Sequence, residues 1–270
     1  MMRTSDSFFA LAARARATDI DRYLCALFAP RPARSALFAL ILFNGEIARV
    51  REMVSEPMLG QIRLQWWRET IEKIYAGQTR RHEVTEPLIE AIRTHDLTRG
   101  YFDRLIDARE QDLNDAPPKT LAALETYAEE SAAPLVSLAL ESVGVDASEF
   151  SDLARHSGIA WALTGQIRAV PHLSIQGRSM LPRNTMCEGG DMAAVITEIL
   201  DTSRYHVDRA RQLRKGLPIA AKRATLQVVL ADAYLRRLAA NGCDPYHMRA
   251  GIGPLHRQLL LIRAAFLGLA

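Results

Sequence analysis

Cysteine is scarce in this sequence, and its spacing excludes two classes of site. The three cysteines, Cys25, Cys187 and Cys243, lie far apart, are odd in number and show no Cys-x-x-Cys arrangement. A disulfide framework or a structural zinc site would require paired or closely spaced cysteines. We therefore expect reduced thiols, as in a cytosolic type of compartment.

Long apolar runs and a strong charge imbalance are also absent. The longest apolar stretch, Ser35 to Asn44, is much shorter than the roughly 18 residues that mark a transmembrane helix. Lys and Arg number 34 against 31 Asp and Glu, and this net charge of +3 does not favour nucleic acid as a partner. The N-terminus carries three arginines, but Asp6 and Asp19 argue against a transit peptide and favour a first surface helix.

Several motifs of common enzymes are missing as well. The sequence has no glycine-rich phosphate loop and no Gly-x-Ser-x-Gly turn. The stretch from His82 to Glu86 lacks the second histidine of a His-Glu-x-x-His zinc motif. The seven histidines are scattered, and we expect most of them to be solvated or partly buried single residues.

What the sequence does contain is typical of helices. Ala, Leu, Arg and Glu dominate, β-branched residues rarely cluster, and Pro and Gly divide the chain into helix-sized segments. We expect helices at roughly 5–28, 32–54, 57–76, 84–95, 98–113, 119–144, 147–169, 190–215, 218–241 and 254–268, with a long loop from Pro171 to Pro182. No internal repeat and no low-complexity linker divides the chain, so the prediction is all-α: a single-domain multi-helix bundle over residues 1–270.

Two helices carry more specific expectations. Residues 38–43 are apolar most of the way round a helical turn, which predicts a helix buried on all sides. The last helix is apolar on one face, and docking on the core is favoured over contact with a membrane surface. We also expect Trp66 to be a buried residue on which stability depends.

One acidic stretch has two readings. Asp103, Asp107 and Glu110 fall on one helical face, and carboxylates spaced in this way can hold magnesium. Arg104 and Arg109 are interleaved with them, so the favoured interpretation is a solvated face of ion pairs.

Several local patterns, in this order along the chain, together resemble the squalene/phytoene synthase family. They are Asp21–Leu24, Phe28–Pro30, Leu64–Glu69, Tyr127-Ala128 and Gly177–Pro182, within a core of about residues 20–240. The resemblance implies the isoprenoid synthase type of helical fold. It also implies a central cavity for two prenyl diphosphates, with magnesium ions held by two Asp-rich motifs on facing helices.

The two Asp-rich motifs are the places where this sequence departs from the family. By ungapped matching, the first motif, Asp-Asp-x-x-Asp, falls on Ala48, Arg49 and Glu52, so two of three carboxylates are missing. The second, Arg-Asp-x-x-Glu-Asp, falls on Arg168, Ala169, Val170, Pro171, His172 and Leu173, where every carboxylate is missing. Gly165 also replaces an amide that relatives often carry.

These departures predict a pseudoenzyme with no catalytic residue, no bound metal and no cofactor. Arginines can still grip a phosphate group directly. The candidate cavity and phosphate-binding residues are therefore Asn44, Glu46, Arg49, Glu52, Arg168 and Arg178.

Within the family, the sequence resembles a non-catalytic branch, the complex I assembly factors. The resemblance lies in Phe43–Val50, Val54–Glu56, Gly60–Trp67, His95–Thr98 and Leu124–Glu129. It implies assistance in respiratory complex I assembly, with complex I subunits or assembly intermediates as protein partners. The predicted location is the cytoplasm of a bacterium, with at most peripheral contact with the inner membrane; a mitochondrial matrix is less favoured.

Two other functions stay open at this point. One is an active prenyltransferase that condenses two prenyl diphosphates, with magnesium on an unusual site such as Glu46, Glu52 and Asp107. The other is an isoprenoid or lipid binder whose cavity is lined by apolar residues such as Phe38, Trp66, Trp67 and Trp161, although residues of this kind more often belong to the core.

Overall fold

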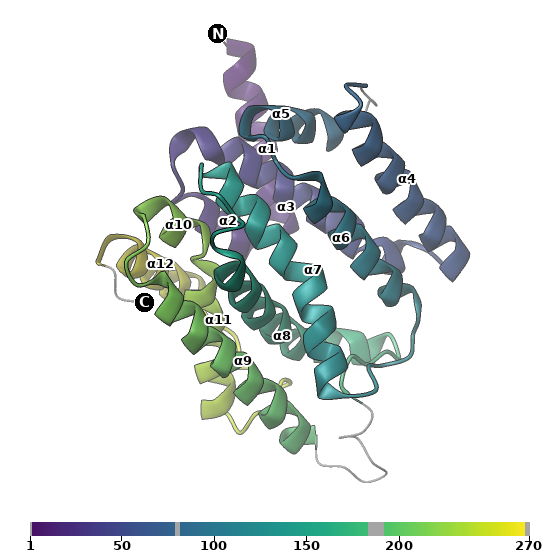
Figure 1. The fold of residues 1–270 in the computed structure, drawn as a ribbon. Coiled ribbons are helices and arrows are strands. Elements are labelled where there is room, and N and C mark those ends of the chain that lie inside the picture. Colours follow the sequence, from purple (N-terminus) through teal and green to yellow (C-terminus); the bar gives the residue numbers. More distant parts are fainter. Residues whose placement is uncertain (1, 79–81, 183–191, 268–270) are drawn as a thin grey trace. The chain divides into compact units, whose positions relative to one another are not determined.

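The computed structural model describes residues 2–78, 82–182 and 192–267, and in these residues it contains helices and no strand. The α-helices are α1 (Met2–Thr18), α2 (Ile20–Ala26), α3 (Arg34–Ala48), α4 (Pro57–Tyr75), α5 (Thr85–His95), α6 (Arg99–Glu110), α7 (Leu121–Ser142), α8 (Ser151–Ile175), α9 (Met192–Arg214), α10 (Ile219–Ala224), α11 (Gln227–Ala240) and α12 (Pro254–Leu267). Three short 3₁₀ helices are η1 (Arg31–Ala33), η2 (Val50–Met53) and η3 (Gln111–Leu113). The prediction of an all-α protein is confirmed (Figure 1).

The structure corrects three of the expected helix boundaries. The first segment is interrupted at Asp19, whose side chain caps α2 by accepting a hydrogen bond from the Arg22 amide at 2.9 Å. The segment expected at 218–241 is two helices that are separated at Thr225. Helix α8 continues through Pro171 as far as Ile175, where we expected the loop to begin.

The described chain forms two compact units, and each unit is assembled from separate segments. Unit 1 comprises Met1–Asn114, Pro134–Ser151 and Pro218–Thr225. Unit 2 comprises Asp115–Ala133, Asp152–Leu217 and Leu226–Ala270. Helix α7 runs without interruption across the boundary at Pro134, so its first part belongs to unit 2 and its second part to unit 1. The single domain expected over residues 1–270 stays a prediction.

Unit 1 is built around α3. This helix contacts α1, α2, α5 and α6, and every residue from Ala36 to Gly45 is buried. The expectation of a helix enclosed on all sides is confirmed. The ring of Phe43 meets the rings of Trp67 and Phe102 edge to face, at centroid distances of 5.4 and 5.3 Å. We call Phe43, Trp67 and Phe102 the aromatic core.

The buried tryptophan of the core is Trp67; Trp66 is only partly buried, so its expected burial was wrong, and the dependence of stability on it stays a prediction. Trp67 is 4% exposed, whereas Trp66 packs against the hydrophobic core of unit 1 from its periphery. Successive residues on a helix point about 100° apart, so only one of two neighbouring tryptophans can face the centre. The sequence shows two adjacent tryptophans, but it does not show which of them faces the core.

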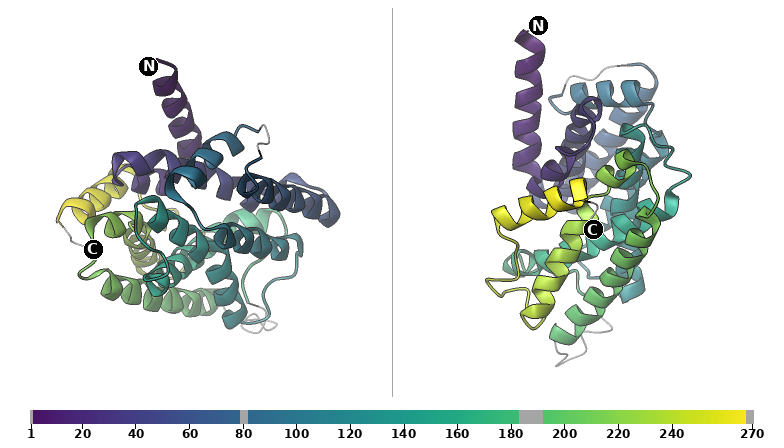
Figure 2. Two further views of the ribbon diagram at one scale, coloured as in Figure 1. Left: turned by 45° about the horizontal axis from the view of Figure 1, so that its top comes forward. Right: turned by 90° about the vertical axis from the view of Figure 1, so that its left-hand side faces the viewer.

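Unit 2 contains α8, α9, α11 and α12 together with the first part of α7. Helix α9 packs against α11, and α11 packs against α12 (Figure 2). Helices α7 and α8 approach closely at Gly158, where a Cβ atom would lie 2.5 Å from the backbone nitrogen of Ala133. Leu261 and Ala264 of α12 are buried, which confirms that the last helix docks. Among the described residues, no helix has the length and apolar character needed to cross a membrane.

Candidate functional site

The positions matched to the first Asp-rich motif lie in unit 1, at the end of α3. Ala48 is the last residue of the helix, Arg49 is its C-cap, and Glu52 falls in the 3₁₀ helix η2. The Arg49 side chain folds back on α3: its Nε donates to the Gly45 carbonyl at 3.2 Å, and a terminal nitrogen lies 3.6 Å from Glu46. Glu46, three residues before Arg49, is therefore engaged by an arginine of the matched motif.

Glu46 also lines a mostly apolar pocket of about 280 Å³ in unit 1. The other lining residues are Val50, Ile62, Arg63, Trp66, Trp67 and His82. Asn44, one turn from Ala48, is buried, and its Oδ1 accepts no hydrogen bond from the described residues. Glu52 is exposed.

The structure does not assemble the alternative magnesium site of unit 1. In the described part of the chain, no three side chains of His, Cys, Asp or Glu come together as a group that could hold a metal ion, and this applies to Glu46, Glu52 and Asp107. Asp107 instead accepts a hydrogen bond from Arg68 of α4 at 2.5 Å.

Arginines engage the acidic face of α6. Arg68 binds both Asp107 and Glu110, the latter at 2.9 Å, and Arg99 pairs with Asp103 at 3.2 Å. The hydrogen bond to Asp107 is the main cause of a raised pKa of the Arg68 guanidinium. The interpretation as ion pairs is confirmed, but Arg68 comes from another helix and was not among the partners that we expected.

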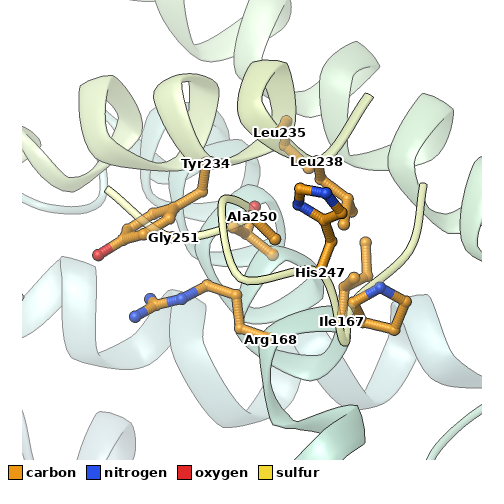
Figure 3. A pocket seen from close by; sticks show the side chains of 10 residues that line it. Ile167, Arg168, Tyr234, Leu235, Leu238, His247, Ala250 and Gly251 are labelled. Carbon is orange, nitrogen blue, oxygen red and sulfur yellow. The ribbon is translucent and has the colours of Figure 1, made fainter. Parts of the chain in front are cut away.

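The positions matched to the second motif lie in unit 2, in the last turns of α8. The guanidinium carbon of Arg168 lies 3.8 Å from the centroid of the Tyr234 ring on α11, and Figure 3 shows the two side chains side by side. Ala169, His172 and Leu173 follow, and His172 shares a 3.0 Å hydrogen bond with Gln176. None of these three side chains is a carboxylate.

Arg168 forms one wall of a pocket of about 160 Å³ between α8, α11 and the loop that precedes α12 (Figure 3). Its other lining residues are Thr164, Ile167, Tyr234, Leu235, Leu238, Pro245, His247, Ala250 and Gly251. Arg178, beyond the end of α8, pairs with Asp115 through its Nε at 3.1 Å. Both candidate arginines of unit 2 are thus held by neighbours within that unit.

A histidine pair that is buried in unit 2 was not predicted from the sequence. His156 of α8 and His206 of α9 share a 2.8 Å hydrogen bond between their Nδ1 atoms, and Nε2 of His206 lies 3.1 Å from Oε1 of Glu125 on α7. We call His156, His206 and Glu125 the histidine cluster. The expectation of mostly single histidines was wrong for these two, because helices separated by 50 residues in sequence bring them together.

The hydrogen bonds define how the histidine cluster is protonated when its rings are neutral. A carboxylate accepts only, so His206 carries its proton on Nε2 and its Nδ1 accepts from His156. Burial lowers the pKa of His156 to about 4, with a further contribution from His206. Burial also lowers the pKa of His206, against the attraction of Glu125. Both rings are therefore neutral near pH 7.

Two further links join the helices around the histidine cluster. Arg155 donates to Glu129 at 2.8 Å, which ties α8 to α7. Ser203 of α9 and Thr164 of α8 both donate to the Ala160 carbonyl, at 3.0 and 2.7 Å. Hydrogen bonds thus join α7, α8 and α9 in this part of unit 2.

Residues 15–261 match the sequence pattern described as squalene/phytoene synthase. The chain belongs to the squalene/phytoene synthase family. A squalene synthase from Alicyclobacillus acidocaldarius has the same fold, with a TM-score of 0.78 at 20% identity over 91% of this chain and 98% of that one. A dehydrosqualene synthase solved with a ligand gives a TM-score of 0.83 at 12% identity over 100% and 99% of the two chains. These likenesses establish the isoprenoid synthase fold.

Among curated proteins, the chain is similar to members of two kinds. The human protein named NADH dehydrogenase (ubiquinone) complex I, assembly factor 6 is 31% identical over 245 residues, which cover 86% of this chain and 74% of that protein. The bovine protein of the same name is 30% identical over the same shares. A presqualene diphosphate synthase of Rhodopseudomonas palustris is 26% identical over 166 residues, covering 60% and 57% of the two chains.

Proposed function

We propose that this chain is a non-catalytic member of its family that assists the assembly of respiratory complex I through contacts with complex I subunits or assembly intermediates. The observation that carries the proposal is its similarity to complex I assembly factors, which extends over 86% of the chain. Two presqualene diphosphate synthases match at lower identity, 26% over 60% of this chain and 24% over 86% of it.

The side chains at the two motif positions support a role without catalysis. Ionisation of a prenyl diphosphate develops negative charge on the leaving group, and magnesium held by several carboxylates stabilises that charge. By the ungapped matching, Ala48 and Arg49 fall on two of the three acidic positions of the first motif, and Ala169, His172 and Leu173 fall on those of the second. The described residues therefore do not fit a magnesium cluster.

The charged residues at the first motif also support a role without catalysis. Glu46 lies 3.6 Å from the Arg49 guanidinium, so a cation approaching this carboxylate meets a positive charge first. Arg49, Arg168 and Arg178 can bind a phosphate group by charge and hydrogen bonding. Binding of that kind holds a diphosphate but supplies no metal to ionise it, so we expect at most ligand binding.

The proposed place of action is a bacterial cytoplasm, at the periphery of the inner membrane. The few, widely spaced cysteines favour a reducing compartment. The proposed partners are proteins.

A deletion strain of the host tests the proposal. We expect deletion to lower the NADH–quinone oxidoreductase activity of isolated membranes, and the wild-type gene to restore it. The Glu52→Gln variant should restore it equally, because Glu52 holds no essential metal in this proposal. Failure of Glu52→Gln, together with success of the neighbouring control Glu56→Gln, would favour a catalytic site.

Purified protein provides the complementary test. Farnesyl and geranylgeranyl diphosphate are incubated with the protein, with and without magnesium, beside an active relative as positive control. We expect no magnesium-dependent release of diphosphate. Turnover at a rate comparable to that of the relative would overturn the proposal and establish the prenyltransferase alternative.

A further inference from the structure

Helix α12 is apolar on two opposite faces, and docking within unit 2 explains only one of them. Leu261 and Ala264 are buried on the inner face, where α12 packs against α11. On the other face, four large side chains are exposed. They are Leu255 at 77%, Leu259 at 59%, Ile262 at 46% and Phe266 at 68%, and we call them the outer stripe.

The spacing of the outer stripe is that of the apolar face of an amphipathic helix. Its residues follow one another at intervals of four, three and four positions, which places all four within an arc of about 60° on a helix of 3.6 residues per turn. The buried residues Leu261 and Ala264 lie on the opposite side of the same helix. A single exposed leucine would need no explanation, but four aligned ones over nearly the whole of α12 do.

The charged residues of the segment that carries the outer stripe have one sign. From Pro245 to the C-terminus the sequence contains no Asp or Glu, but it contains three arginines and two histidines. Arg263 and His256 are exposed and lie together along one edge of the outer stripe. Arg257 faces the docked side, where it donates to the Ile252 carbonyl at 3.4 Å.

We propose that the outer stripe of α12 binds the surface of a bilayer that contains anionic lipids, with α12 lying in the plane of the interface. A helix with an apolar stripe flanked by basic residues binds membranes in this way: the apolar side chains enter the boundary between headgroups and acyl chains, and the cations meet lipid phosphates. The single sign of charge is the feature that selects an anionic surface.

A protein occupant fits these observations less well. A standard protein interface buries about 800 Å² on each partner, and four side chains that are already partly covered supply much less than this. A second copy of α12 would also bring Arg263 and His256 of both chains together without an acidic partner on either helix. Binding to a bilayer requires no minimum interface area, and the lipid phosphates supply negative charge for Arg263 and His256.

The test is flotation of the purified full chain with vesicles. We expect the protein to float with vesicles of phosphatidylglycerol and phosphatidylcholine, to float much less with phosphatidylcholine alone, and to be released by added salt. The assay needs no complex I, so its result is independent of the proposed function.

Matched variants locate the contact. Leu259→Glu should weaken binding about tenfold or more, since it places a charge in the apolar face and opposes the lipid charge. Ile62→Glu on α4 is the control, because Ile62 is 60% exposed and lies in unit 1. Arg263→Glu should weaken binding about fivefold or more and reduce its salt dependence, whereas Arg93→Glu on α5 should have little effect.

Circular dichroism and thermal unfolding would establish that each variant is folded, which we expect because all four positions are exposed. Absence of binding to the anionic vesicles would overturn the proposal, as would equal binding by Leu259→Glu and Ile62→Glu. Sedimentation provides a separate check: a wild-type dimer that Leu259→Glu dissociates, with no vesicle binding, would make the outer stripe a protein interface instead.

Discussion

The aromatic core of unit 1 and the two histidines of the histidine cluster in unit 2 are buried, but the two regions hold their helices together in different ways. Phe43, Trp67 and Phe102 meet through ring faces and edges at 5.3 and 5.4 Å, and their stabilisation comes from apolar area removed from water. His156, His206 and Glu125 meet through hydrogen bonds of 2.8 and 3.1 Å. Removal of side-chain volume should therefore destabilise the aromatic core. Protonation should destabilise the histidine cluster.

Removal of a core indole should have the largest effect. Trp67→Ala empties space between α3, α4 and α6, and we expect the free energy of unfolding to fall by about 3–5 kcal/mol. Trp66→Ala is the control, with an expected loss of about 1–2 kcal/mol, since that indole is partly exposed. Urea denaturation measures both, and equal losses would mean that the two indoles contribute alike.

The close approach of α7 and α8 in unit 2 is sensitive to added volume. Gly158→Ala places a Cβ atom against the Ala133 backbone, which cannot move as a side chain can, so we expect a loss of about 1–3 kcal/mol. Gly165→Ala on the same helix is the control, because no heavy atom in the described part of the chain lies within 4 Å of its added Cβ. That change should instead stabilise the helix, by up to about 1 kcal/mol. Thermal melts of the two variants should shift in opposite directions.

Acid should weaken the histidine cluster. The pKa of His156 is about 4 in the folded protein and about 6.5 when unfolded, so between these values the unfolded chain binds the extra proton. The free energy of unfolding should therefore fall as the pH drops from about 6.5 to 4, by on the order of 2 kcal/mol from this residue.

A substitution separates this contribution from the titration of carboxylates. His156→Gln keeps a hydrogen-bonding side chain but has no ring to protonate, so its stability should depend less steeply on pH over that range. His256→Gln, at an exposed position, serves as the control. If denaturation at several pH values gave the same slope for wild type and His156→Gln, the ring would not be the group that titrates.

The ion pairs of Arg68 should have the smallest effect. Asp107 and Glu110 are 61% and 54% exposed, so water and salt screen their attraction. Arg68→Met keeps most of the aliphatic chain, and we expect it to lower the free energy of unfolding by less than about 1 kcal/mol. Denaturation at low and high sodium chloride should show the difference shrinking with salt, and a large, salt-independent loss would contradict this view.

These two buried regions also differ in how far the sequence predicts them. The helices of unit 1 follow from local patterns: the expected segment 57–76 is α4, with Pro57 in the first turn and Gly77 at φ +77° after its end. The burial of α3 follows from apolar residues on every side of the helix. Such patterns involve only residues that are close in sequence, so they can be recognised without a structure.

The histidine cluster, the Arg68 pairs and the Arg168–Tyr234 contact depend on residues that are distant in sequence. Pro171 shows the same limit in another form, because a proline usually marks the end of a helix, yet α8 continues past it. At the candidate site, the contact of Arg49 with Glu46 is local and was foreseeable. The partners of Arg168 and Arg178 come from α11 and from the start of the segment before α7, and periodicity carries no information about them.

The division of each unit into separate stretches has a consequence for the gene. Unit 1 takes its last segment from Pro218–Thr225, so a premature stop codon anywhere before this point leaves unit 1 without α10 and unit 2 without α11 and α12. Neither unit can be produced from one uninterrupted piece of coding sequence. Nonsense and frameshift alleles across most of the reading frame should therefore behave as complete losses, and partial products should be substrates for cellular proteases.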